Sequence, residues 1–379
     1  MPRNTLGVRK SFWSLDWVLV MAVIPMLGAG LVTMNSFTGD SILFDRQVIW
    51  ICISFIVFFV LSFVDFRFLR RTGVVVGLFL LSVFMLLALL LVGSTANGAQ
   101  SWFSIGSVSF EPADAVKLVL IAILAKYFSR RHIEIAHIRH ILVSGFYALV
   151  FFALISLQPD FGSAIIIFFI WFGMVLVSGI SKKHLALVFC VGALVFGGLW
   201  FYVFKDYQKN RIINFIHPLS DIRGTGYNAY QSTIAVGSGE LFGKGVGFGT
   251  QSRLKFLPEY ETDFVFAAFA EEWGFVGVII LFSLYAVVMW RILLHAMRGS
   301  TNFEMLFGLG IFTLFSSHFF VNVGMNIGLL PVTGITLPFM SYGGTHLLTE
   351  FTGLGVLMGM SRYQRAAHKD LSKNELLGV

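Results

Sequence analysis

Ten apolar runs, each long enough to cross a lipid bilayer, constrain this chain more than any other feature. A transmembrane helix needs about 17–25 mostly apolar residues, and lipid favours helices because they satisfy their own backbone hydrogen bonds. The sequence therefore predicts an all-α polytopic membrane protein. Without an internal repeat or a low-complexity linker, we expect one domain over residues 1–379. The expected spans lie near 15–34, 47–64, 73–93, 113–128, 141–157, 163–180, 184–204, 264–290, 304–325 and 342–361.

Composition supports the membrane assignment. The chain is 57% hydrophobic and 12% charged, whereas soluble domains carry about 25% charged residues. The net charge of +7 follows from the positive-inside rule and needs no nucleic-acid partner. The basic N-terminal segment leads into a full-length span, which predicts a retained first helix and no cleaved signal peptide. Cys52 and Cys190 both lie in apolar runs, so we expect small buried side chains and no disulfide.

The positions of the basic residues predict the orientation of the chain. Most of its 27 Lys and Arg residues fall in segments that are cytoplasmic if both termini are cytoplasmic. This arrangement places the longest loop, residues 205–262, outside the membrane between the seventh and eighth spans. Loops of that length without secondary structure are unusual and often functional. We therefore expect an active site on the extracytoplasmic side.

One stretch, residues 237–277, combines this loop with the start of the eighth span and carries charges of both signs. It reads GSGELFGKGVGFGTQSRLKFLPEYETDFVFAAFAEEWGFVG. Charges at the edge of a membrane helix are costly, which favours a functional role; the alternative is a solvated loop that caps a helix. Four glycines alternate with other residues from 243 to 249. They permit backbone that presents N–H groups to an anion, or they serve only tight turns; both interpretations stay open.

Shorter segments point to the same outer face. Asp114 and Lys117 are spaced to pair on one helix face, just after Pro112, which suits the start of a helix. Asp160 is placed to cap the sixth span. Residues 322–350 contain prolines and glycines that break any continuous helix, so this segment is expected to be buried in protein or to line a cavity. Within it, His346 and Glu350 are spaced to form a buried pair.

Together these motifs resemble the SEDS family, whose members include RodA and FtsW, over almost the whole chain. The resemblance is carried by QPDFG (158–162), NFIHPLSD (214–221), GYNAYQSTIAVGSGELFGKGVGFGTQ (226–251), LPEYETDFVFAAFAEEWGFVG (257–277) and GMNIGLLPVTGITLPFMSYGG (324–344). The run GKGVGFGTQSRLKFLPE is more similar to the RodA branch. Two positions depart from the family pattern: Glu261 stands where His is usual, and Asp114 stands where Glu is usual.

The resemblance implies a peptidoglycan glycosyltransferase active in cell-wall elongation. Such enzymes polymerise lipid II into a nascent glycan strand at the outer surface of the bacterial cytoplasmic (inner) membrane. Their partner is a class B penicillin-binding protein, which supplies the transpeptidase. The family's essential acid is the aspartate of a Thr-Asp-Phe motif, which corresponds to Asp263 in this sequence.

The residues themselves fit this chemistry. A carboxylate such as Asp263 can take the proton of an attacking sugar hydroxyl, and Glu259 and Glu261, if close, would raise its pKa. Alternatively Asp263 helps to hold a divalent cation, Mg²⁺ or Mn²⁺. The leaving diphosphate needs positive charge. The candidate substrate-binding residues are Arg211, Lys244, Arg253, Lys255, Glu259, Asp114, Lys117 and Asp160.

Two other function classes compete with the enzyme. A transporter that flips lipid II would also use broken helices, but transporters often show inverted repeats and charges near the membrane midplane. Here no repeat is visible and the charges gather at one face. A scaffold for wall-synthesis partners would leave the outward acids and bases without a role.

Overall fold

The computed structural model describes residues 15–36, 42–96, 99–105, 108–129, 138–202, 206–217, 226–254 and 256–376. These residues form ten long helices, one for each predicted span, so the predicted number and order of spans are confirmed. The second helix begins earlier than predicted, and the last extends further. The ten are α1 (Trp17–Asn35), α2 (Ile42–Ser62), α3 (Thr72–Val92), α4 (Pro112–Ser129), α5 (Ile138–Leu157), α6 (Phe161–Val177), α7 (Lys182–Tyr202), α11 (Val265–Met297), α12 (Asn302–Asn326) and α13 (Gly344–Leu376).

Seven of these helices are long and apolar enough, by length and composition, to cross a membrane: α1, α2, α3, α5, α7, α11 and α12. Helix α6 is shorter, with 17 residues, and α4 and α13 carry charged side chains. Helix α4 is central, because it packs against α3, α5, α6, α12 and α13. Most of its residues are buried. The charges of Asp114 and Lys117 are therefore enclosed by protein.

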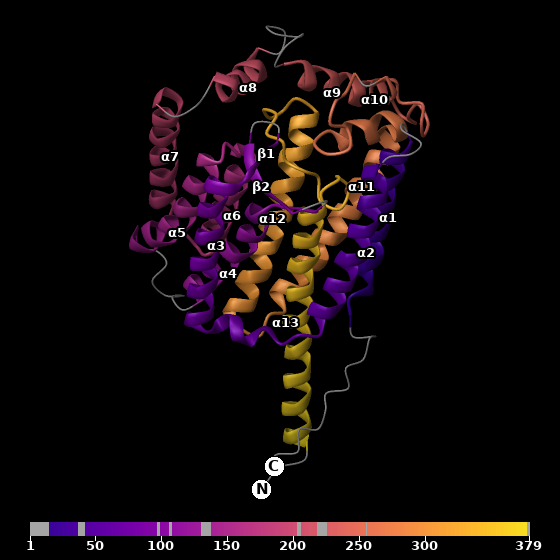
Figure 1. Cartoon of the computed structure of the whole chain (residues 1–379). Helices are drawn as coiled ribbons and strands as arrows, with labels where there is room; N and C mark the ends of the chain where they lie inside the picture. The colour runs from indigo at the N-terminus through magenta and orange to yellow at the C-terminus, as the bar shows by residue number, and fades with distance from the viewer. Residues whose placement is uncertain are drawn as a thin grey trace.

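The helices stand side by side, and the connecting structure gathers at one end (Figure 1). Helix α2 packs along α13, and α11 packs against α1 and α12. Helix α7 lies at the edge of the bundle (Figure 1), and none of the residues in its most apolar window is buried. The C-terminal part of α13 protrudes from the end opposite α8 (Asp206–Ile216), α9 (Tyr227–Ser238) and α10 (Thr250–Arg253).

The two cysteines correct one expectation from the sequence. Cys52 on α2 and Cys190 on α7 are free thiols, as expected, but both are exposed on the helix surfaces instead of buried. The reason is physical: lipid is as apolar as the protein interior, so an apolar run does not distinguish a lipid-facing side chain from a core side chain.

The connecting segments contain more regular structure than the sequence indicated. The described part of the 205–262 segment forms three helices, α8 (Asp206–Ile216), α9 (Tyr227–Ser238) and α10 (Thr250–Arg253). Between α3 and α4 lies a three-stranded antiparallel sheet in the order β1-β2-β3, made of β1 (Ser94–Ala96), β2 (Ala99–Ile105) and β3 (Val108–Phe110). Strands this short have weak sequence patterns, so the sheet was not predicted. A short 3₁₀ helix, Phe66–Arg70, precedes α3.

The segment between α12 and α13 has no helix from Pro331 to Pro338, as its prolines and glycines predicted. Gly328, Gly334 and Phe339 have φ of +75°, +76° and +62°, so the chain passes through the left-handed region three times between α12 and α13. Leu337, Phe339 and Met340 are buried in the main hydrophobic core. Irregular backbone at this depth is thus covered by protein, and part of it lines the cavity described next.

Candidate active site

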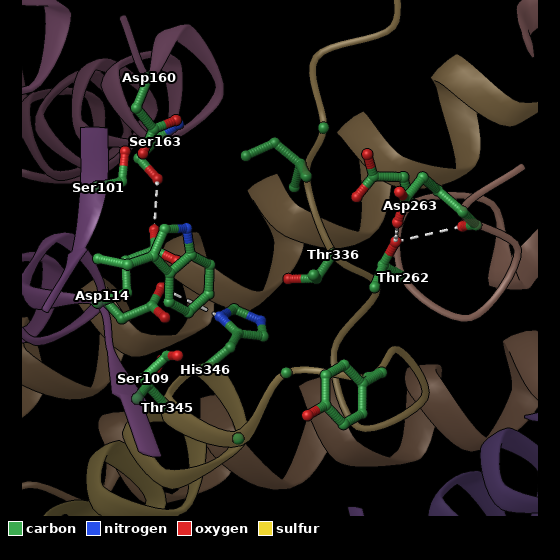
Figure 2. A pocket seen from close by; sticks show the side chains of 18 of the residues that line it. Ser101, Ser109, Asp114, Asp160, Ser163, Thr262, Asp263, Thr336, Thr345 and His346 are labelled. Atoms are coloured by element: carbon green, nitrogen blue, oxygen red, sulfur yellow. Dashed lines mark hydrogen bonds and ion pairs between the residues drawn. The ribbon is translucent and has the colours of Figure 1, made fainter. Parts of the chain in front are cut away.

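A cavity of about 770 Å³ lies among the helix ends near α8 and the small sheet. Its walls come from α2, the small sheet, the starts of α4 and α6, α8, the turn before α11, α12, the 331–343 segment and the start of α13. Figure 2 shows Asp263 and Thr262 on one side of this space and Asp114 and His346 on the other. The cavity therefore brings together acids that are far apart in the sequence.

The main chain around Asp263 is fixed by three residues from two neighbouring segments. Its carbonyl oxygen accepts hydrogen bonds from Asn322 Nδ2 (2.9 Å) and Asn326 Nδ2 (3.1 Å), two fully buried amides of α12. The preceding carbonyl of Thr262 accepts from Ser341 Oγ at 2.6 Å. Because these contacts all hold the backbone, the carboxylate is left facing the cavity. Buried amide networks of this kind define one backbone position.

Asp263 does not cap α11. The N-cap position is Phe264, and no side chain makes the capping hydrogen bond. Burial raises the pKa of Asp263 to about 6, with Glu259 and Asp160 adding to the rise and Arg211 opposing it. The expectation that neighbouring acids raise this pKa is met by Glu259. Glu261 does not line the cavity; its carboxylate accepts from the Tyr260 hydroxyl at 3.2 Å.

The opposite wall is a buried ion-pair network. Lys117 Nζ lies 2.8 Å from Asp114 Oδ1, which confirms the predicted pair, and both side chains are almost fully buried. His346 joins them, with Nδ1 3.2 Å from the same Asp114 oxygen and Nε2 2.9 Å from Glu350. The ring of His318 stacks on His346 with centroids 4.6 Å apart. The predicted His346–Glu350 pair is confirmed, and its link to Asp114 is new.

Three further acids reach the same cavity. Asp160 caps α6 as predicted, accepting from Ser163 N at 3.0 Å, and it also lines the cavity. Glu259 accepts from Thr262 Oγ1 at 3.0 Å. Glu111, just before α4, lines the wall near the sheet. Its burial, together with the charges of Asp114 and Asp160, raises its pKa well above the ordinary value.

The loop cations that were predicted to bind substrate lie in different places. Arg211 on α8 lines the cavity. Lys244 does not; its ammonium lies 2.6 Å from Glu271 and donates to Thr250 Oγ1 at 2.9 Å. Arg253, at the end of α10, is exposed and is also absent from the cavity wall. Lys255 lies outside the described residues. Among the described loop cations that were predicted, the cavity thus receives Arg211.

The glycine-rich loop serves tight turns. Gly243, Gly245 and Gly247 all have positive φ, between +79° and +94°, whereas Gly249 does not. Its amides bond to the protein's own acceptors: Gly245 N donates to the Glu272 carbonyl (3.0 Å), and Gly247 N donates to the Glu272 carboxylate (2.7 Å). A β-carbon at Gly243 would collide with the backbone of Glu272. Of the two interpretations, the structure favours turns and close packing.

The chain is similar in sequence to a known protein family. Residues 9–366 match the family described as cell cycle protein and named for FtsW, RodA and SpoVE. The chain belongs to this SEDS family. Peptidoglycan glycosyltransferase MrdB of Escherichia coli K12 is 31% identical over 96% of this chain and 98% of its own length. Stage V sporulation protein E of Bacillus subtilis strain 168 is 35% identical, covering 92% and 98%.

Solved structures of SEDS proteins share the fold. Rod shape determining protein RodA of Thermus thermophilus superposes with a TM-score of 0.70 at 30% identity, covering 93% of this chain and 98% of that one. A chain from a study of polymerization and crosslinking by a peptidoglycan synthase complex gives 0.79 at 31% identity, covering 92% and 98%. The predicted family and fold are confirmed. Relatives named FtsW reach 30% and 36% identity, so identity does not separate the branches.

Sequence reasoning missed two parts of this SEDS site. Asn322 and Asn326 hold Asp263 in place, and their only signal was a pair of amides four residues apart in an apolar span. The sheet contributes Trp102 and several serines to the wall. The sequence signal for the sheet was a short run of serines among apolar residues. The charges of the same loop form the stronger pattern.

Proposed function

We propose that this SEDS protein is a peptidoglycan glycosyltransferase that polymerises lipid II into glycan strands during cell-wall elongation. The observation that carries the proposal is the Asp263 carboxylate, which faces a cavity of about 770 Å³ while buried amides hold its backbone. A pKa of about 6 suits a base at neutral pH, because most of the group is then ionised and can still bind a proton.

Asp263 would act on the attacking hydroxyl. The hydroxyl oxygen of one sugar forms a bond to the anomeric carbon of another, and the bond from that carbon to the diphosphate breaks. The hydroxyl proton passes to the Asp263 carboxylate, and the diphosphate leaves as an anion on its polyprenyl carrier. Arg211, on the same cavity wall, supplies positive charge for the leaving group. Asp263 then releases its proton to water.

Lys117 and Asp114 would fix the floor of the site. Their pair is almost fully buried yet borders the cavity, and His346 and Glu350 extend it. A lysine held this way keeps its charge at a fixed position, which orients an anionic group without a large reorganisation. Asp160 and Glu259 complete the set of polar side chains that we propose to bind substrate.

A divalent cation fits only if the substrate shares in holding it. Among the described residues, no group of three or more His, Cys, Asp or Glu side chains could hold a metal ion. Asp263 and Glu259 are two carboxylates on the same cavity, and Mg²⁺ is commonly held by one or two carboxylates together with substrate phosphates. Mg²⁺ or Mn²⁺ bound in this way would neutralise charge on the diphosphate.

Location and partner belong to the same proposal. We expect the cavity to open on the extracytoplasmic side of the bacterial inner (cytoplasmic) membrane, and the chain to work with a class B penicillin-binding protein. The support for a partner is the relative solved in a peptidoglycan synthase complex. Sidedness is tested by replacing Cys52 and Cys190 and then labelling Arg253→Cys with an impermeant reagent. Labelling only after the cytoplasmic side is exposed would overturn this orientation.

The decisive experiment uses purified protein and purified lipid II, with and without the cognate transpeptidase. Glycan polymer made by the wild-type chain and absent with Asp263→Asn supports the proposal. The same preparation in vesicles tests the rival transporter by following movement of labelled lipid II between leaflets. Lipid movement without polymer would replace the enzyme with a flippase. Neither polymer nor movement, in a chain that still binds its transpeptidase, would favour a scaffold.

A further inference from the structure

One face of the small sheet between α3 and α4 carries a tryptophan surrounded by serines. Residues directly opposite each other in antiparallel strands share a face, as do residues two apart on one strand. Ser94 lies opposite Trp102, and Ser104 lies opposite Ser109. Trp102 and Ser104 are two apart on β2, so all four side chains stand on the same face.

This face forms a wall of the cavity. Ser94, Trp102, Ser104 and Ser109 all line it, and Figure 2 shows Ser109 across the space from Asp263. The serines are close to one another, with Ser94 Oγ 2.9 Å from Ser104 Oγ. On the other face, Phe103 packs against the main hydrophobic core. The sheet is therefore anchored on its apolar side and presents its hydroxyls to the cavity.

The fourth serine of the sheet, Ser101, stands on the same face of β2 as Phe103, and its hydroxyl has no described partner. Ser101 is 3% exposed, lines the same cavity, and its Oγ makes no hydrogen bond with any described residue. A buried hydroxyl without a partner destabilises the folded protein, so such groups usually have a functional explanation. A ligand hydroxyl in the cavity would satisfy it.

We propose that this sheet is a saccharide subsite, with Trp102 stacking on a pyranose ring and the serines binding its hydroxyls. The inference rests on the proposed function, since it assigns the sugar of the same substrate to one wall of the cavity. A pyranose has an apolar C–H face and a polar rim. A half-buried indole ringed by hydroxyls matches both, because aromatic rings contribute a flat apolar surface and convergent polar groups fix orientation.

The other parts of a lipid-linked sugar do not fit this wall. A diphosphate needs cations, yet the four residues of the face are uncharged and the acid Glu111 lies beside them on the cavity wall. A polyprenyl tail would gain nothing from four hydroxyl groups. Sugar on the sheet would leave the diphosphate for Arg211, whose charge acts on Asp263 on the opposite side of the cavity.

The first test separates sugar binding from diphosphate binding. Trp102→Ala should raise the KM for lipid II roughly tenfold, the size expected for truncating an anchoring tryptophan, with kcat changed much less. Trp102→Phe should recover most of the loss. Undecaprenyl diphosphate, which lacks the sugar, should inhibit both variants as well as it inhibits wild type. Trp290→Ala, at an exposed tryptophan of α11 away from the cavity, is the matched control and should keep the wild-type KM.

The second test uses the buried hydroxyl. Ser101→Ala should leave the thermal midpoint unchanged or higher, because an unsatisfied group is removed, while the KM for lipid II rises about threefold, near the loss of one hydrogen bond. If Ser101 had a structural role, Ser101→Ala would lower the thermal midpoint and raise the KM together. The subsite is overturned if Trp102→Ala and Ser101→Ala both keep the wild-type KM, or if inhibition by undecaprenyl diphosphate weakens as much as lipid II binding. Wild-type polymerisation in the same assay shows that such a failure is not a failure of the proposed function.

Discussion

Asp263 and Glu271 lie eight residues apart in one charged stretch, yet the structure gives them opposite surroundings. Glu271 is fully buried and accepts hydrogen bonds from Lys244 Nζ (2.6 Å), Thr250 Oγ1 (3.0 Å) and Gln251 N (3.2 Å). The Asp263 carboxylate faces the cavity, and among the described residues its hydrogen bonds are made by its backbone carbonyl alone.

This difference teaches how to separate structural from functional acids. A buried charge that is fully paired holds a loop, because breaking the pair would leave an uncompensated charge. An acid that is held by its backbone but unsatisfied at its carboxylate is available for chemistry, and its pKa is shifted as a consequence. Lys244 and Glu271 therefore belong to the architecture of the glycine-rich loop, and Asp263 belongs to the site.

The largest effect is expected at Asp263. Asp263→Asn should reduce polymerisation by at least roughly a hundredfold, the lower end for a lost acid–base group. The variant should be as stable as wild type or more stable at neutral pH. The folded-state pKa of Asp263 is raised from 3.8 to about 6, so its stabilising contribution is complete below pH 4 and is lost as pH rises through 6. Asparagine does not ionise, so the Asp263→Asn variant does not lose stability in this way as pH rises.

Turnover and thermal midpoint at pH 7.5 and pH 4 measure both parts of this prediction. Glu261→Gln is the matched control, because that neighbouring acid bonds to Tyr260 and does not line the cavity; it should keep activity. Near wild-type polymerisation by Asp263→Asn would end the catalytic assignment.

Glu271 should respond in the opposite way. Glu271→Ala leaves Lys244 and the loop amides without their acceptor and should destabilise the protein by about 3–5 kcal/mol, the range for breaking a buried pair. Activity per folded molecule should fall much less than in Asp263→Asn. Thermal unfolding combined with turnover corrected for folded protein checks this. A stable but inactive Glu271→Ala would remove the distinction between the two acids.

Arg211 should give a smaller loss than Asp263. Arg211→Ala is expected to lower turnover roughly tenfold, because one charge-assisted contact to the diphosphate is lost. Arg253→Ala is the matched control: this arginine lies in the same outer segment but does not line the cavity, and its loss should matter little. Equal losses of turnover in both variants would mean that activity depends on the total charge of this segment and not on the position of Arg211 in the cavity wall.

The smallest expected effect is a shift in the pH profile. Polymerisation by wild type should fall as pH drops through about 6, because Asp263 becomes protonated. Arg211 lowers this pKa, so Arg211→Ala should move the acidic limb to higher pH. Rates at saturating lipid II between pH 5 and pH 8.5 measure the shift. A limb that stays in place, or moves to lower pH, would contradict the assignment of this limb to Asp263.

Features that depend on neighbouring residues in the chain were determined by the sequence alone. Hydropathy over windows of about 20 residues gave all ten spans, and the i, i+3 and i, i+4 spacings gave the Asp114–Lys117 and His346–Glu350 pairs. Prolines and glycines gave the broken 331–343 segment. The family motifs predicted Asp263 as the essential acid, because those motifs are contiguous in the sequence.

Tertiary structure alone decided which charged groups meet. Asn322 reaches the carbonyl of Asp263 across 59 positions, and His346 reaches Asp114 across 232; no local pattern carries such information. Lys244 and Arg211 were equal candidates in the sequence, since both are cations of one outer segment, and only packing sent one to Glu271 and the other to the cavity. Cys52 and Cys190 make the same point in the membrane, because lipid and protein core are equally apolar and the direction a side chain faces is set by how the helices pack.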